Sequence, residues 1–573
     1  MTGLRQQIED ICIDAFEKAG FAREHGVVRE SNRPDLADFQ CNGLLSVAKL
    51  ERMAPPQAAE RVMPLLEQSD MFDVTFTPPG FLNFVVSDAA LVRQVGEVLA
   101  DPRGGIPLEG APQHYLLDYG GPNLAKEMHV GHLRSSIVGH TLSTILRFAG
   151  NRVTSDVHLG DWGLQIGQLI AQIEDERPEL LKEGSEGGFD MSDLQVWYPK
   201  ASARSKEDFE FLERARSATA HLQAGRPEYE RLWRAISDVS SLSLKRDFGR
   251  LGVEFDYWYG ESRYQPMLNE IVDDLLEKGI AEVHQGAVII RLPENEKLPP
   301  LILRNSNGGY GYGATDLATI HERVTQDQPD TILYVVDARQ KTHFRQVFGA
   351  AARCGYLDHT TAEHIAFGTV NGADGKPFKT RAGGVMRLHD LLEAMNEAAR
   401  KRLDATGAAP ESTRNQTAEQ IAIAAIRFGE LCHDRESSYV FDIDKFVQFE
   451  GKTGPYIQYS CVRLRSLKAK AAESGLAPGG VTKLGEGGRD LVLCLDELPT
   501  QFERTIALRK PHVIANHAYK LANNTNRYYQ ANRILGGDAT EEEARSHLGL
   551  LDAALQQLSL CLELLGIETP AQM

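Results

Sequence analysis

The chain contains a stretch, residues 122–132, that reads Pro122-Asn123-Leu124-Ala125-Lys126-Glu127-Met128-His129-Val130-Gly131-His132. The apolar run 114–118 before it is typical of a strand, and residues 133–148 after it have apolar side chains at helical spacing. A second strand-like run, 153–159, follows at once. The segment therefore predicts a β-α-β unit of an α/β protein, with two histidines at the start of its helix.

The start of such a helix is where α/β proteins bind phosphate, because free backbone N–H groups and the positive end of the helix dipole favour an anion. Two imidazoles separated by Val-Gly suggest hydrogen-bond donors for a triphosphate rather than a pair of metal ligands. The spacing alone is equally compatible with two solvated histidines. The residues around the two histidines are needed to distinguish a phosphate-binding site from two solvated side chains.

Length and composition set limits on the class of protein. A chain of 573 residues exceeds one hydrophobic core, so three or more domains are expected. A hydrophobic content of 42% with 25% charged residues is ordinary for a soluble globular protein. No stretch approaches the roughly 20 apolar residues of a membrane span, and no secretory signal is visible. We therefore expect a cytoplasmic protein without a membrane partner.

The cysteines and the net charge bear on ligands. The seven cysteines are scattered and never form C-x-x-C, which argues against a disulfide framework and a structural zinc site. The net charge of −18 disfavours a nucleic-acid partner at first sight, but phosphate binding depends on local charge. Residues 503–533 carry six basic side chains against one acid, a local charge of +5, interleaved with three tyrosines. This pattern suits recognition of single-stranded RNA loops, and it is equally typical of a basic helix packed in a bundle.

The pattern of elements divides the chain into three parts. Residues 1–110 read as a small α+β domain, with helices expected within 4–19, 41–50 and 56–66. Residues 111–405 alternate strands and helices, which indicates a parallel sheet covered by helices, interrupted by a charged helical insertion at about 174–250. Residues 406–573 read as helical throughout. The predicted fold is a multidomain α/β protein with a Rossmann-type catalytic domain, an N-terminal α+β domain and a C-terminal all-α bundle.

The segment from Asp118 to Ser136, followed by His158-Leu159-Gly160-Asp161-Trp162-Gly163, closely resembles the HIGH region of class I aminoacyl-tRNA synthetases, in the form found in arginyl-tRNA synthetases. The resemblance continues in order along nearly the whole chain. It implies ligation of L-arginine to tRNA(Arg) through arginyl-adenylate, with release of AMP and pyrophosphate. It also implies an N-terminal domain that contacts the tRNA elbow and a C-terminal domain that binds the anticodon. Gly120-Gly121 stand where many relatives have Ser-Ser, so the contacts to the α-amino group stay open.

A second constellation is the basic, glycine-flanked loop 375–385. Such a loop after a parallel sheet can clamp a triphosphate, although a solvated charge cluster is at least as compatible with it. Its residues Phe378-Lys379-Thr380-Arg381-Ala382-Gly383 resemble a degenerate KMSKS loop, with Thr380 in place of the second lysine. In relatives with this departure a lysine before the HIGH motif is thought to compensate, and Lys126 has that position. The resemblance thus implies ATP binding by residues 122–132, and catalytic roles for Lys126, His129, His132, Lys379 and Arg381.

An arginine substrate requires a pocket that is selective for its side chain. A guanidinium is a permanent cation with a planar fork of donors, so a selective pocket needs carboxylates and an aromatic face. The resemblance implies that Glu261 and Asp316 face the guanidinium, that Tyr312 forms the aromatic wall, and that Asn123 and Gln340 hold the α-amino end. A lone carboxylate is usually a surface charge, and only the joint match favours these roles.

For the RNA, Gly454-Pro455-Tyr456-Ile457-Gln458-Tyr459 and the arginines after it resemble the start of the family's anticodon-binding domain. The residues expected to bind tRNA are Tyr456, Gln458, Arg463, Arg527 and Tyr528. We expect ATP to bind with Mg²⁺, without a metal held by the protein, and we expect a monomer. Two alternatives stay open: a regulatory or RNA-binding paralogue, and an enzyme that transfers arginine to another acceptor.

Overall fold

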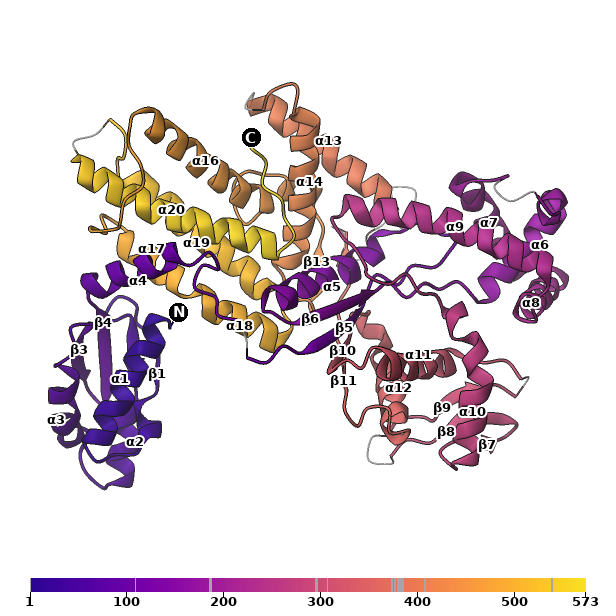
Figure 1. Cartoon of the computed structure of the whole chain (residues 1–573), viewed down its shortest axis with the longest axis horizontal. Coiled ribbons are helices and arrows are strands. Elements are labelled where there is room, and N and C mark those ends of the chain that lie inside the picture. Colours follow the sequence, from indigo (N-terminus) through magenta and orange to yellow (C-terminus); the bar gives the residue numbers. More distant parts are fainter. Residues whose placement is uncertain are drawn as a thin grey trace.

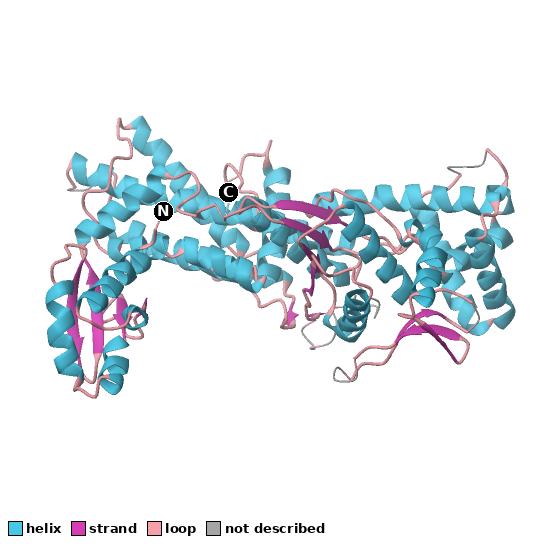
Figure 2. Cartoon of the chain, turned by 60° about the horizontal axis from the view of Figure 1, so that its bottom comes forward, coloured by secondary structure: helices cyan, strands magenta, loops and turns pink. Residues whose placement is uncertain are grey.

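The computed structural model describes residues 2–108, 110–184, 188–293, 297–306, 308–372, 375, 378, 386–406, 409–536 and 539–573. The molecule is elongated, with the N-terminal domain at one end and the helical insertion at the other (Figure 1). Helices dominate the long body, and the strands are confined to small sheets (Figure 2). None of the helices in the described ranges is long and apolar enough to cross a membrane.

The N-terminal domain is an antiparallel sheet covered by helices. Its elements are α1 (Leu4–Lys18), β1 (Val28–Glu30), β2 (Phe39–Cys41), α2 (Gly43–Leu50), α3 (Pro55–Leu66), β3 (Phe72–Thr77), β4 (Phe81–Val86) and α4 (Asp88–Ala100). The strand order is β1-β2-β4-β3. Ile8, Cys12 and Phe16 of α1 are fully buried, as the helical spacing of apolar residues predicts. The three helices expected from the sequence are confirmed.

The central domain is built on a four-stranded parallel sheet. Its strands are β5 (His114–Asp118), β6 (Arg152–Asp156), β10 (Thr331–Tyr334) and β11 (Thr361–His364), in the order β11-β10-β5-β6. Helix α5 (Val130–Phe148) crosses from β5 to β6, and α12 (Lys341–Arg353) crosses from β10 to β11. The chain therefore turns to opposite sides of β5, and the switch point lies between β5 and β10. Ligands bind to parallel sheets at such a point, at the carboxyl ends of the strands.

The expected helical insertion leaves the sheet after β6. It comprises α6 (Leu164–Glu176), α7 (Met191–Glu207), α8 (Phe209–Gln223) and α9 (Pro227–Arg250). The returning chain runs parallel to the end of β6, where Tyr257 pairs with Asp156 and Gly260 with Leu159. Both ends of the insertion therefore lie beside the carboxyl edge of the sheet.

A small layer follows before the sheet is completed. It contains α10 (Leu268–Glu277), β7 (Glu282–His284), β8 (Ala287–Ile290), β9 (Leu301–Arg304) and α11 (Tyr312–Gln326). The three strands form an antiparallel sheet, and the apolar sides of α10 and α11 pack into a core shared with β10 and α12. Arg323, in the last turn of α11, reaches the ends of β5 and β6.

The rest of the chain is mainly helical, but residues 406–573, which were expected to be helical throughout, also contain a two-residue strand at 439–440 that pairs in parallel with residues 370–371. Its elements are β12 (Val370–Asn371), α13 (Leu388–Thr406), α14 (Arg414–Leu431), β13 (Tyr439–Val440), α15 (Ile443–Phe446), α16 (Gly454–Glu473), α17 (Gly488–Asp496), α18 (Leu498–Leu508), α19 (His512–Ala531) and α20 (Glu541–Leu564). With these elements the predicted fold class is confirmed.

A buried ion pair joins the helical half to the catalytic sheet. Arg134 of α5 donates to Glu430 of α14 over 2.7 Å, and the two side chains are 1% and 0% exposed. Arg134 also donates to the carbonyl of Ser437 over 2.8 Å. Both charges are removed from water, so each side chain needs the other to compensate its charge.

We predict that Arg134→Leu lowers the free energy of unfolding by about 3–5 kcal/mol, because it leaves the Glu430 carboxylate buried and unpaired. Urea unfolding followed by circular dichroism measures this change. The double variant Arg134→Leu/Glu430→Leu should recover much of the loss. Arg93→Leu removes an exposed pair with Asp70 and should change stability by less than about 1 kcal/mol. Equal effects of Arg134→Leu and Arg93→Leu would contradict the prediction.

Candidate active site

A cavity of about 570 Å³ opens at the switch point of the sheet. The residues that line it come from the ends of β5 and β10, from the start of α5, and from the segment around β12. They are Asp118, Tyr119, Gly120, Gly121, Asn123, His129, Val130, Gly131, His132, Arg134, Ser135, Val335, Val336, Asp337, Arg339, Gln340, Phe367, Gly368, Thr369, Val370 and Phe378. The cavity thus brings the start of α5 together with Asn123 and Gln340, which lie far apart in the sequence.

The two signature histidines stack at the start of α5. Their ring centroids are 4.0 Å apart, and the rings are inclined by 22°. His129 caps the helix, with Nδ1 accepting from the N–H of Gly131 over 3.0 Å. His132 reaches back, with Nδ1 accepting from the N–H of His129 over 3.2 Å. A Cβ at Gly131 would lie 2.6 Å from the His129 ring, so the closeness of ring and backbone requires glycine.

These two bonds fix the chemistry of both rings. Each Nδ1 accepts a hydrogen bond, so each neutral ring carries its proton on Nε2 and can donate it. Burial, the His129 ring and the charge of Lys126 lower the pKa of His132 to about 3. The pKa of His129 is also lowered, chiefly by burial. The start of α5 therefore offers two neutral N–H donors beside the positive end of the helix.

Lys126 and Glu127 lie against the helical insertion. The Lys126 ammonium lies 4.8 Å from the ring centroid of Tyr198 on α7. The Glu127 carboxylate accepts from Gln195 of the same helix and from Arg387, the latter over 3.2 Å. Lys126 does not line the cavity, but its charge lowers the pKa of both histidines, which indicates that it lies near them.

A group of carboxylates lies beside the cavity. Asn123 pairs with Gly160, and the adjacent Leu159 pairs with Gly260, so Glu261 is two backbone pairings away from Asn123. Burial and the charges of Asp161 and Asp316 raise the pKa of Glu261 to about 7. Asp161 is held by Ser262, whose N–H donates to it over 2.9 Å. Several carboxylates therefore stand close together beside the cavity, and Glu261 is the one whose pKa is raised to about 7.

Asp316 is partnered by a histidine. His343 Nε2 lies 2.5 Å from its carboxylate, and this contact raises the pKa of His343. Tyr312, one turn earlier on α11, is 73% exposed. Partial desolvation and the charges of Glu261 and Asp316 raise the pKa of Tyr312, which places its hydroxyl near both carboxylates.

Beneath the cavity, Arg323 of α11 joins the ends of two neighbouring strands, β5 and β6. Its guanidinium donates to Asp118 of β5 and to Asp156 of β6, each over 2.7 Å. The Arg323 side chain is 3% exposed. Asp118, Asp156 and His158 would otherwise form a group of metal-ligating type, but the Arg323 guanidinium is already hydrogen-bonded to both carboxylates.

Comparison with known proteins identifies the family. The model of the arginyl-tRNA synthetase N-terminal domain matches residues 2–86, that of the class I (R) tRNA synthetase catalytic domain residues 94–443, and that of the DALR anticodon-binding domain residues 457–573. An arginine–tRNA ligase of Maricaulis maris is 42% identical over all of both chains, and one of Alkaliphilus oremlandii is 39% identical over all of both. The chain belongs to the arginine–tRNA ligase family.

Solved structures show the same fold. Arginyl-tRNA synthetase from Plasmodium falciparum superposes with a TM-score of 0.79 at 24% identity, and that from Thermus thermophilus with 0.78 at 22%. Both comparisons cover all of both chains. The order of N-terminal domain, Rossmann-type domain and helical domain is therefore that of the family.

For the family's signature loop, the structure describes only the flanks. Lys379 and Arg381, with Thr380 between them, lie outside the described residues. Before them, Phe378 lines the cavity and donates its N–H to the carbonyl of Val370 over 3.1 Å. After them, the carbonyl of Met386 accepts from the N–H of Val130 over 3.0 Å. Both flanks of the loop are therefore anchored beside the histidines.

The stretch 122–132 divides between the cavity and the core. Asn123, His129, Val130, Gly131 and His132 line the cavity. Leu124, Ala125 and Met128 are buried among apolar side chains, and Pro122 is also buried. The side chains of these four residues therefore support the loop rather than contact a ligand.

Two of the residues expected to bind tRNA are in the core, which corrects the prediction. Gln458 is 0% exposed and donates to the carbonyls of Gln420 and Glu568. Tyr528 is 0% exposed, and its hydroxyl lies 2.5 Å from Nδ1 of His547. Neither side chain can contact RNA in this fold. The remaining three, Tyr456, Arg463 and Arg527, reach the surface at least in part.

Sequence reasoning missed several residues that build the site. His343, Gln165 and Arg323 contact Asp316, Asn123 and the strand ends, respectively. Only His343 had a local signal, because it lies one turn after Gln340. The partners of the others are brought together by long-range folding.

We predict that His132 stays neutral down to pH 5 in the free protein, because burial and the neighbouring ring and ammonium disfavour a second proton. Histidine NMR, with His132→Gln to assign the signal, would show no titration above that pH. Lys126→Met removes one of the nearby charges and should raise the pKa of His132. An ordinary pKa near 6.5 for His132 would contradict the geometry.

Proposed function

We propose that this chain ligates L-arginine to tRNA(Arg) in two steps, with ATP bound as its Mg²⁺ complex in the cavity at the start of α5. Family membership supports the overall reaction. The observation that carries the site is the convergence of two neutral imidazole donors, Asn123 and Gln340 on one cavity, next to Glu261 and Asp316.

In the first step the carboxylate of arginine attacks the α-phosphorus of ATP in line, which forms arginyl-adenylate and expels pyrophosphate. The Nε2–H groups of His129 and His132 donate to phosphate oxygens as charge develops on them, together with the dipole of α5. Lys126, with Lys379 and Arg381 of the loop, compensates the charge of the leaving pyrophosphate. The work of the protein is positioning and charge stabilisation.

In the second step the terminal ribose hydroxyl of the tRNA attacks the adenylate carbonyl and releases AMP. The N-terminal domain is assigned to the tRNA elbow and the helical domain to the anticodon, with Tyr456, Arg463 and Arg527 as the contacts. We place the enzyme in the cytoplasm as a monomer.

The guanidinium of the substrate lies between Glu261 and Asp316 in this proposal, with Tyr312 over one face. Asn123 and Gln340 hold the α-amino end. A site whose carboxylates need a planar cation rejects citrulline, because the neutral ureido group would leave buried charge unpaired; such mismatches discriminate by about 10⁴-fold or more.

The central experiment is aminoacylation of tRNA(Arg) with labelled arginine, run beside ATP–pyrophosphate exchange with and without that tRNA. Charging supports the proposal, and exchange that needs tRNA would show that the RNA completes the active site. Exchange without charging would move the acceptor elsewhere. Absence of both reactions would favour a regulatory paralogue.

We predict that His132→Ala lowers the adenylation rate by about 10²-fold or more, because it removes a preorganised donor to the reacting phosphate. The arginine KM should change little, since the ring lies on the phosphate side. Pre-steady-state adenylation measures both. A rate within a few-fold of wild type would remove His132 from the mechanism.

We also predict that arginine binding weakens below pH 7. Glu261 binds the guanidinium only as the carboxylate, and its pKa of about 7 means that the proton is taken up as the pH falls through neutrality. One such proton raises the arginine KM by up to about tenfold per pH unit below the pKa. In Glu261→Gln the arginine KM is high and this dependence disappears. A wild-type KM that is flat between pH 5.5 and 8 would contradict the assignment.

A further inference from the structure

Helix α7 of the insertion places two side chains against the stretch 122–132, which we call the signature. Gln195 Nε2 donates to one oxygen of Glu127, and the Tyr198 ring lies 4.8 Å from the Lys126 ammonium. The two residues are three apart on the helix, so they share one face. Two consecutive signature residues are therefore met by two neighbouring side chains of a segment outside the sheet.

The signature is held from its other side by the chain that follows the basic loop. The second oxygen of Glu127 accepts from Arg387 over 3.2 Å. The N–H of Leu388 donates to the carbonyl of Met128 over 2.8 Å, and His129 pairs with Arg387 in an antiparallel bridge. Glu127 thus links three segments: the stretch 122–132, α7, and the segment that follows the basic loop 375–385.

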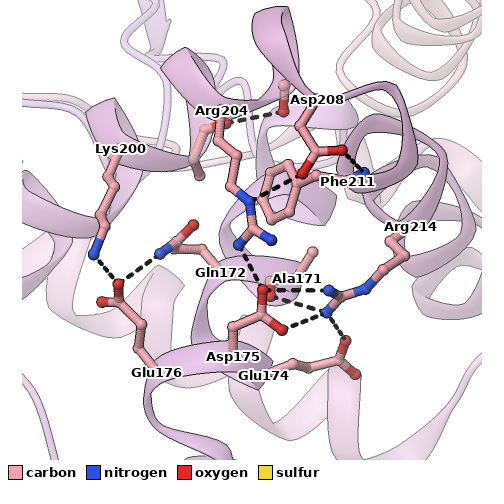
Figure 3. Close-up of polar contacts among 12 residues, drawn as sticks. Ala171, Gln172, Glu174, Asp175, Glu176, Lys200, Arg204, Asp208, Phe211 and Arg214 are labelled. Carbon is pink, nitrogen blue, oxygen red and sulfur yellow. Dashed lines mark hydrogen bonds and ion pairs between the residues drawn. The ribbon is translucent and has the colours of Figure 1, made fainter.

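Helix α7 is itself fixed within the insertion. Arg204 of α7 donates to Asp175 of α6 over 2.6 Å, and Arg214 of α8 shares the same carboxylate over 2.9 Å (Figure 3). Lys200 of α7 pairs with Glu176 of α6. Trp197, between Gln195 and Tyr198, is 5% exposed. The face that meets the signature is therefore carried by a packed, cross-linked helix.

We propose that Gln195 and Tyr198 are positioning residues for adenylation, acting through Glu127 and Lys126. A lysine has four flexible methylene groups, and its ammonium is useful to the triphosphate only where it is held. The Tyr198 ring restricts it through a cation–π contact, while Gln195 and Arg387 orient the backbone of the signature through Glu127. This inference rests on the proposed function. It adds two residues of the insertion to those that set the rate of adenylation.

The test compares Tyr198→Leu, Tyr198→Phe and Gln195→Ala with wild type in the full-length chain. The readout is ATP–pyrophosphate exchange with saturating tRNA(Arg), resolved into kcat and the KM for ATP and arginine. Val196→Ala is the matched control, because Val196 lies on the same turn and is 63% exposed. Thermal unfolding of each variant reports any general loss of structure.

Tyr198→Leu should lower kcat about fivefold, the size of a partly exposed cation–π contact, with the arginine KM unchanged. Tyr198→Phe keeps the aromatic face and should stay within twofold of wild type. In a Lys126→Ala background Tyr198→Leu should have no further effect, because its target is gone. Gln195→Ala should lower kcat or raise the ATP KM at least threefold, and Val196→Ala should do neither.

Three results would overturn either the proposed function or the positioning role. Absence of arginine-dependent exchange in wild type would overturn the proposed function. Exchange in wild type with equal rates for Tyr198→Leu and Tyr198→Phe would overturn the positioning role alone. A drop that persists in the Lys126→Ala background would do the same, since a loss of packing does not depend on Lys126.

Discussion

The candidate active site depends on one guanidinium, that of Arg323, placed between the carboxylates that end β5 and β6. Two carboxylates at the ends of neighbouring strands would repel each other in a site closed to water. A buried arginine without a partner would also carry a large desolvation free energy. Together they hold the two strand ends at a fixed spacing. The pairing then continues beyond the strands, because the N–H groups of Tyr119 and Gly121 donate to the carbonyls of Asp156 and Val157. The loops that carry Asn123 and Gly160 start from this joint.

From that joint the site separates into two electrostatic halves. On one side, the start of α5 and its neutral imidazoles offer N–H donors without adding a repulsive cation for the nearby Lys126. On the other, Glu261 and Asp316 lie close together, and burial with the neighbouring carboxylates raises the pKa of Glu261. A substrate with a carboxylate at one end and a guanidinium at the other can span both halves. The raised pKa of Glu261 and the lowered pKa of His132 are thus two consequences of burial, with opposite direction because one group is an acid and the other a base.

Local patterns predicted the β-α-β unit and the position of the histidines, since strand, turn and helix signals lie within some forty residues of one another. The contacts between residues far apart in the sequence could not be predicted from local patterns. Arg323 meets Asp118 across 205 positions and Asp156 across 167, and no local signal records such a contact. The net charge of residues 503–533 likewise depends on contacts that the local sequence does not contain. Lys510, Lys520 and Arg509 are paired in the fold with Asp434, Glu497 and Glu363, so much of the apparent charge is neutralised by distant acids.

The position of the helical insertion gives a physical reason for its charge-rich sequence. Its helices pack on one another with little support from the sheet, so they rely on ion pairs such as those on Asp175 to fix their mutual arrangement. Each exposed pair is weak alone, but one carboxylate shared by two arginines from two helices orders both helices at once. The chain enters the insertion just after His158 and returns through Gly260, immediately before Glu261. A displacement of the insertion would therefore reach both halves of the site through short, hydrogen-bonded connections. The contacts of α7 with Lys126 and Glu127 provide a third connection, on the side of the proposed ATP site.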